Sequence, residues 1–129
     1  MNPEEFKKRT KAFGLRIIHL VESLPETRAG RVIGNQLLRA GTSVGANYRA
    51  ACRTKSRADF ISKMGTVEEE AGESLYWLEI LVDAELVNQA RVGGLVKEGD
   101  EILSIVVASI NTSRRHAQSA VRNPQSAMP

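Results

Sequence analysis

Residues 60–81 read FISKMGTVEEEAGESLYWLEIL and carry the clearest periodic pattern in the chain. Apolar or small side chains recur there in alternating steps of four and three residues, which places them on one face of an α-helix. The members of this series are Phe60, Met64, Val67, Ala71, Ser74, Leu78 and Leu81. The pattern predicts a helix over 56–85, with Ser56 as its N-cap.

Three further segments repeat this spacing, over 3–24, 28–53 and 89–116. Thr27 and Asn88 stand where they can cap the second and the last of them. The four prolines lie at positions 3, 25, 124 and 129, so none interrupts the segments between. Four helices with three short connections predict an all-α fold, an antiparallel up-down-up-down four-helix bundle. We expect it to form one domain over 1–122, followed by a flexible tail at 123–129.

Composition narrows the function classes. A chain of 129 residues with 42% hydrophobic residues can build one core, and no apolar run approaches the ~20 residues that cross a bilayer. The first residues are charged and lack the pattern of a signal peptide, so we expect a cytoplasmic protein without a membrane partner. Cys52 is the only cysteine, which excludes an intrachain disulfide and a multi-cysteine metal site. No cofactor is expected.

Charge is divided sharply along the chain. Residues 28–63 carry eight Lys and Arg against one acid, whereas residues 64–101 carry ten acids against two basic residues. If Leu37, Ala40, Val44 and Asn47 face inward, the basic side chains of 28–53 face outward. Together with the following turn, the candidate binding residues are Arg28, Arg31, Arg39, Arg49, Arg53, Lys55 and Arg57.

Two interpretations of this basic row stay open. Arginine forks suit phosphate oxygens, which favours a surface that binds nucleic acid with strong salt dependence. The alternative is a solvated face, or one that pairs with the acidic helix of a neighbouring subunit.

Three other positions stand out on the helices. Asn47 interrupts an inward series of apolar or small residues, so we predict a structural polar group whose amide fixes helix register. The small residues at 41, 45 and 46 would let a neighbouring helix approach closely. Tyr76 and Trp77 flank the inward face of 56–85, where they either seal the bundle edge or form a subunit contact, which we favour slightly.

An enzymatic alternative rests on carboxylates. Glu69, Glu70 and Glu73 form an EExxE run that is followed by Glu98 and Glu101, a layout similar to that of all-helical nucleoside triphosphate pyrophosphohydrolases, which bind magnesium. Those enzymes close the second motif with aspartate, and Glu69 lies opposite the inward face of its helix. We therefore predict no catalytic and no metal-binding residues.

Residues 24–87 resemble the 23S ribosomal RNA intervening-sequence proteins, a family of four-helix bundles. The resemblance lies in a Q-L-x-R-A-x-x-S-V-x-x-N run and in S-x-x-D-F after a basic turn. The matching residues are Gln36, Leu37, Arg39, Ala40, Ser43, Val44, Asn47, Ser56, Asp59 and Phe60. The chain departs from the family pattern at Gly45, where proline is common, and at 49–51, where A-E-G is usual.

The resemblance implies a cyclic homopentamer with no established enzymatic activity. A relative, the accessory protein of diversity-generating retroelements, forms a basic pentameric barrel that associates with a reverse transcriptase and nucleic acid. The implied partners are further copies of the chain, structured RNA or a reverse-transcriptase-like protein. We predict a non-enzymatic, self-assembling bundle that binds RNA or other nucleic acid. A magnesium-dependent pyrophosphohydrolase and a pure assembly module are the alternatives.

Overall fold

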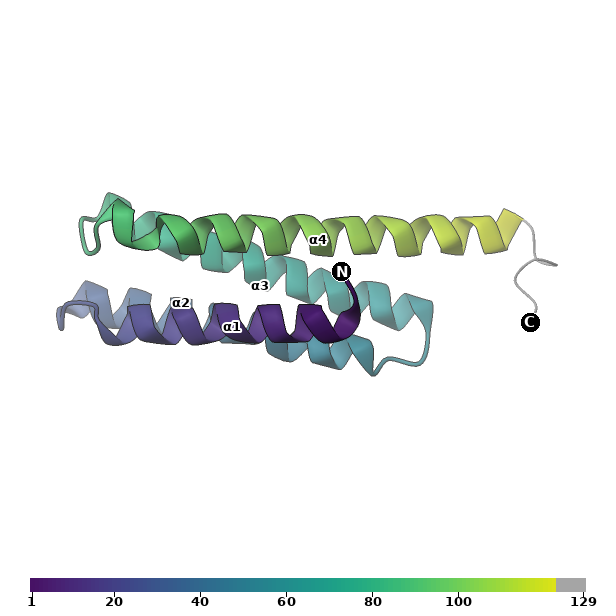
Figure 1. Cartoon of the computed structure of the whole chain (residues 1–129), viewed down its shortest axis with the longest axis horizontal. Coiled ribbons are helices and arrows are strands. Elements are labelled where there is room, and N and C mark those ends of the chain that lie inside the picture. Colours follow the sequence, from purple (N-terminus) through teal and green to yellow (C-terminus); the bar gives the residue numbers. More distant parts are fainter. Residues whose placement is uncertain (123–129) are drawn as a thin grey trace.

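The computed structural model describes residues 1–122, the last four of them by backbone alone. Four helices run alternately up and down: α1 (Pro3–Glu22), α2 (Arg28–Cys52), α3 (Arg57–Asp83) and α4 (Gln89–Arg122). Figure 1 shows α4 continuing past the turn that joins α2 to α3. The all-α, up-and-down arrangement is confirmed. The first three helices agree with the predicted ranges within two residues, α4 extends six residues beyond 116, and the predicted tail at 123–129 lies outside the described residues.

Polar caps fix where the helices begin. A side-chain oxygen before each helix accepts a hydrogen bond from an amide that has no partner within the helix. The distances are 2.9 Å from Glu5 N to Asn2, 3.0 Å from Gly30 N to Thr27, 3.0 Å from Asp59 N to Ser56, and 2.9 Å from Ala90 N to Asn88. The predicted caps Thr27, Ser56 and Asn88 are confirmed.

One hydrophobic core runs along the bundle and takes side chains from all four helices. Phe13 and Ile17 of α1, Leu37 of α2, Leu78 of α3 and Ile102 of α4 are each at most 1% exposed. The polar members Thr10 and Ser74 are also buried, and their hydroxyls donate to the carbonyls of Phe6 and Glu70 one turn earlier. The periodic inward faces therefore do meet in a common core.

The inward face of α2 differs from the prediction at one position. Tyr48 is buried, and its ring packs edge-on against Phe6 with centroids 4.7 Å apart. Asn47 is only half-buried, and its amide donates to the carbonyl of Ser43 in the same helix at 2.9 Å. The inward placement of Asn47 was wrong. Between Val44 and Ala51 the inward face can pass through Asn47, in steps of three and four residues, or through Tyr48, in steps of four and three, and both suit a helix. Burying the large ring is the more favourable choice.

Glycines on α2 let α1 approach closely. A Cβ atom added at Gly41 would lie 2.7 Å from Cγ1 of Ile17, and one at Gly45 would lie 3.3 Å from the hydroxyl of Thr10. A side chain at Gly41 would overlap Ile17, whereas one at Gly45 would require Thr10 to shift by a few tenths of an ångström. The close approach predicted from the small residues of this segment is confirmed.

Candidate nucleic-acid interface

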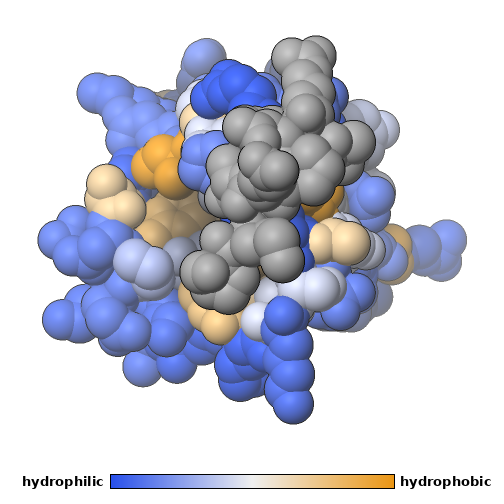
Figure 2. Space-filling view, turned by 90° about the vertical axis from the view of Figure 1, so that its right-hand side faces the viewer, coloured by the Kyte–Doolittle hydropathy of each residue, from blue (hydrophilic) through white to orange (hydrophobic). Residues whose placement is uncertain are grey.

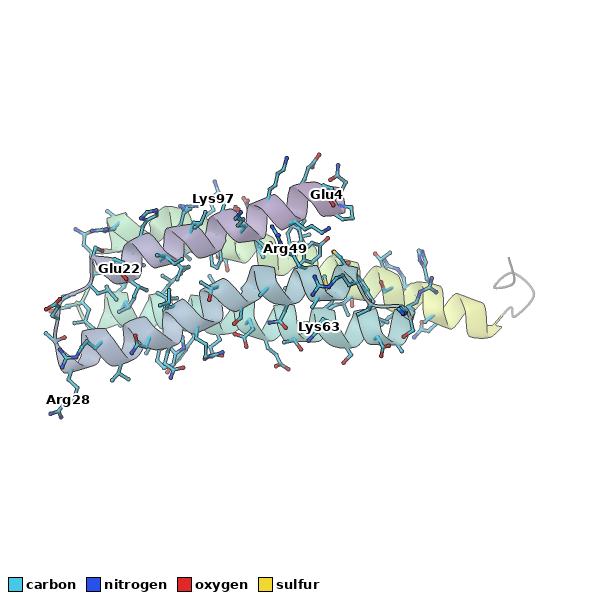
Figure 3. All side chains as sticks on the ribbon, turned by 90° about the horizontal axis from the view of Figure 1, so that it is seen from below. Glu4, Glu22, Arg28, Arg49, Lys63 and Lys97 are labelled. Atoms are coloured by element: carbon cyan, nitrogen blue, oxygen red, sulfur yellow. The ribbon has the colours of Figure 1, made fainter. Side chains whose placement is uncertain are left out.

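All seven predicted binding residues have exposed side chains, but the structure does not bring them together. Arg28 and Arg31 begin α2 at the end of the bundle where α1 turns into α2. Arg49 and Arg53 lie at its opposite end, beside Lys55 of the next turn and Arg57, the first residue of α3. Figure 3 shows Arg28 and Arg49 well separated along the bundle. The row is thus two basic groups at opposite ends of one helix.

Arg39, between these groups, is engaged by the acidic helix of its own chain. Its guanidinium donates to Glu70 at 3.2 Å and to Glu73 at 2.5 Å. The contacts raise the pKa of Arg39 and hold the pKa of the Glu73 carboxyl below its usual range. A phosphate would have to displace two carboxylates to use this arginine, so it contributes least to an anion-binding surface.

Positive charge gathers where the turn between α2 and α3 lies. The antiparallel topology brings the N-terminal part of α1, the end of α2, the start of α3 and the last described side chains of α4 to this place. We call residues 1–11, 46–66 and 105–118 the basic end. It holds eleven Lys and Arg against three acids, a formal charge of +8, whereas residues 12–45 and 67–104 hold six against twelve, a charge of −6. The bundle is therefore strongly polarised along its axis.

The basic end is hollowed. An open hollow of about 690 Å³ lies between α1, the turn and α4, with Lys7, Lys55 and Arg57 among its lining residues and no Asp or Glu among those described. Figure 2 looks onto this end, where hydrophilic side chains project around a few hydrophobic ones. An anion entering the hollow would meet cations from two separate segments of the chain.

Sequence reasoning missed part of this site. Lys7, Ser109 and Ser113 line the hollow although they lie far from α2 in the sequence. The signal available was topological, because in an up-and-down bundle the beginning of the first helix and the end of the fourth lie at the same end as the second turn. Counting charge by bundle end would have revealed the basic end.

Four of the five acidic residues of the enzymatic alternative pair with arginines of other helices, while Glu69 is exposed. Glu98 accepts two hydrogen bonds from Arg9 of α1, at 2.7 and 2.8 Å, and Glu101 pairs with the same guanidinium. Arg9 also lowers the pKa of Glu98. Glu70 and Glu73, as described, face Arg39. The two carboxylate groups therefore turn toward different helices, and the side chains described for residues 1–118 include no cluster of three His, Cys, Asp or Glu that could hold a metal ion.

Tyr76 and Trp77 form an aromatic pair on α3. Their ring centroids are 5.1 Å apart, with an angle of 69° between the rings. Trp77 is half-buried and its indole N–H donates to Glu73 at 3.2 Å, whereas Tyr76 is 52% exposed. Trp77 seals the bundle edge, and a subunit contact through Tyr76 stays a prediction.

Comparison with known proteins agrees with the fold and the sequence motifs. Residues 4–108 match the family model described as 23S rRNA-intervening sequence protein. The chain belongs to this family. It is also similar to a crystal structure, at 1.70 Å resolution, of a protein with unknown function from the S23 ribosomal protein family of Bacteroides thetaiotaomicron VPI-5482.

That crystal structure shares 34% sequence identity with the chain and has a TM-score of 0.80, and the similarity covers 86% of this chain and 99% of the other. No curated protein matches the chain. The family resemblance inferred from the sequence is confirmed. Within the described helices, none is both long and apolar enough to span a membrane.

Proposed function

We propose that this member of the 23S rRNA-intervening sequence protein family binds RNA or another nucleic acid through its basic end, and that it has no catalytic activity of its own. The observation that carries the proposal is the excess of eleven Lys and Arg over three acids at one end, where Lys7, Lys55 and Arg57 line a hollow with no acid among its described lining residues; one of the eleven, Arg9, is paired with Glu98 and Glu101. A field of this kind attracts a polyanion and concentrates its phosphates at one place.

The groups at the basic end suit phosphate in two ways. Arg49, Arg53 and Arg57 present planar forks that can donate two hydrogen bonds to one phosphate group, and Lys55 adds a point charge. The N-terminus of α3, which begins at Arg57, adds the positive end of a helix dipole. Contacts of this kind fix position on a nucleic acid and depend little on its sequence.

The direct test is the fluorescence anisotropy of labelled single-stranded RNA of mixed sequence, measured from about 50 to about 200 mM salt. If about five cations each neutralise one phosphate, the slope of log K against log[salt] is about −3.5, and the affinity falls about 100-fold over this range. Absence of binding at low salt, or an affinity that salt does not change, would contradict the proposal.

We also propose that the chain assembles with itself, as a cyclic homopentamer. The opposite charges of the two bundle halves and the exposed ring of Tyr76 support a contact between copies. Light scattering at micromolar concentration should give a mass several times that of the 14.2 kDa chain, and Tyr76→Ser should lower it. Val32→Ser, which changes another exposed apolar side chain, is the matched control. A monomer in the unmodified protein would contradict this part of the proposal.

The absence of catalysis is tested with nucleoside triphosphates and magnesium. No magnesium-dependent release of pyrophosphate is expected, because Arg39 already occupies Glu70 and Glu73. Release that disappears in Glu73→Gln would show that the chain is an enzyme after all.

A further inference from the structure

The hollow at the basic end has two chemically different sides. Lys7, Lys55 and Arg57 provide a basic rim. The lining also includes the half-buried Phe60, the nearly buried Tyr48, and the small apolar residues Pro3 and Ala51. Its volume of about 690 Å³ falls within the ~300–1,000 Å³ typical of sites for small organic ligands, and far exceeds what a phosphate group alone would fill. The hollow therefore suits a ligand that is anionic at one end and flat and apolar at the other.

Tyr48 is a buried residue whose polar group is left available in this hollow. It is 7% exposed, and its ring is held edge-on against Phe6. The hydroxyl has the weak thiol of Cys52 as its hydrogen-bonding neighbour, and forms none of the hydrogen bonds to nitrogen or oxygen found among the described residues. The hydroxyl is protonated at neutral pH, as in any tyrosine, and can donate; burial raises the pKa of Tyr48 further. No buried side-chain oxygen among the described residues lacks a hydrogen-bond partner, so the Tyr48 hydroxyl is open to solvent in the hollow and can bond to a ligand there.

The basic rim includes the start of α3. Ser56 caps this helix by accepting from the amide of Asp59, and Lys55 and Arg57 stand on either side of the cap. The exposed carboxylate of Asp59 is not among the residues that line the hollow. A phosphate at the rim would meet two side-chain cations and the helix dipole together.

The wall contributed by α4 is polar but uncharged. Ser109 and Ser113 lie one helical turn apart and both line the hollow. Each hydroxyl can donate and accept a hydrogen bond, which suits the mixed donors and acceptors on the edge of a nucleobase. Aromatic rings on one side and hydroxyls on another are the groups that recognise a base removed from its stack.

We propose that the hollow binds a single unpaired nucleotide of RNA, with its phosphate at Lys55 and Arg57 and its base against Phe60 and toward the hydroxyl of Tyr48. This inference rests on the proposed binding of nucleic acid and names the form of RNA that the basic end selects. A base inside a continuous duplex is stacked and paired, so it cannot enter the hollow without first being unstacked.

The test compares two RNA hairpins of identical stem sequence, one with a single bulged nucleotide in the stem and one fully paired. The unmodified protein should bind the bulged hairpin about tenfold more tightly. Tyr48→Phe removes the hydroxyl and keeps the ring, and should weaken binding of the bulged hairpin about fivefold while leaving the paired hairpin unchanged. Tyr76→Phe, which removes a hydroxyl from an exposed ring outside the hollow, is the matched control and should change neither.

Ser113→Ala gives a second variant that does not touch the core around Tyr48, and it should also reduce the preference for the bulged hairpin. Equal affinity of the unmodified protein for the two hairpins would overturn this inference and leave the proposed binding of nucleic acid intact. A preference that neither Tyr48→Phe nor Ser113→Ala reduces would overturn the assignment to the hollow. Failure to bind either hairpin at low salt would overturn both proposals.

Discussion

Gly41→Ala is expected to destabilise the bundle, although alanine favours helices by about 1 kcal/mol over glycine. The new Cβ would lie 2.7, 2.9 and 3.1 Å from three side-chain atoms of Ile17, distances well inside van der Waals contact. Ile17 is fully buried and β-branched, so it cannot rotate away within the packed core. Overpacking of this kind costs about 1–3 kcal/mol, which leaves a net loss of about 1 kcal/mol after the gain in helix propensity.

Gly72→Ala is the matched control, because Gly72 also lies inside a long helix but a Cβ there would have no neighbour within 4 Å. This change should raise the free energy of unfolding by about 1 kcal/mol through helix propensity alone. Urea unfolding followed by circular dichroism and by the fluorescence of Trp77, the only tryptophan, measures both variants. Protein concentration is held fixed, because self-association would make the unfolding midpoint depend on it.

The urea concentration at the unfolding midpoint should fall for Gly41→Ala and rise for Gly72→Ala, while the dependence of the free energy of unfolding on urea concentration stays unchanged. In an Ile17→Ala background, which removes the nearest contacting atoms, Gly41→Ala should no longer destabilise. If both alanine variants stabilise the protein equally, or if the cost of Gly41→Ala is the same in the Ile17→Ala background, the close packing of α1 on α2 is wrong.

Three further changes test other contacts of the fold. Arg9→Met should lower the free energy of unfolding by about 1 kcal/mol near neutral pH. Because Arg9 holds the pKa of Glu98 low, this ion pair stabilises the unmodified protein above about pH 4.5 and ceases to do so as pH falls further. The free energy of unfolding of Arg9→Met should therefore depend less on pH in the acid range. Parallel pH profiles of the variant and the unmodified protein would contradict this. Thr27→Ala should cost about 1 kcal/mol in thermal or urea unfolding through loss of the N-cap, whereas Ser62→Ala at an exposed site should cost little. Gly30→Ala should lower the free energy of unfolding by about 3 kcal/mol in the same assay, because its Cβ would lie 2.2 Å from the carbonyl oxygen of Pro25. An unchanged free energy of unfolding would mean that this turn is not formed as described.

Helix positions could be predicted from the sequence because apolar spacing and polar caps are local signals. The predicted end of the last helix, at 116, is too early: the apolar series stops at Ile110, but no proline follows before Pro124 and α4 continues to Arg122. The choice between Asn47 and Tyr48 depended on the neighbouring helix. Spacing alone allows either, and the ring of Phe6 decides it.

The candidate site was harder to predict because it depends on which segments meet. All seven predicted basic residues are exposed as expected, but the ion pairs of Arg39 with α3 join helices that the linear pattern could not align. The hollow draws Lys7 and Ser113 from opposite ends of the chain. Periodicity assigns a residue to a face of its own helix. To predict which residues meet at a site, one must also know how the helices are aligned along the bundle axis.

The central claim is that one end of the bundle binds RNA, and paired charge reversals test it most directly. Arg53→Glu with Arg57→Glu alters the basic end, whereas Arg28→Glu with Arg31→Glu makes the same change in charge at the opposite end of α2. The first pair should weaken RNA binding at least tenfold at low salt and make the slope of log K against log[salt] shallower by about 0.7 per residue, with helicity unchanged. The Arg28→Glu, Arg31→Glu variant should leave the RNA affinity and the salt slope nearly unchanged. Equal losses in the two variants, or a larger loss in the second, would contradict the account.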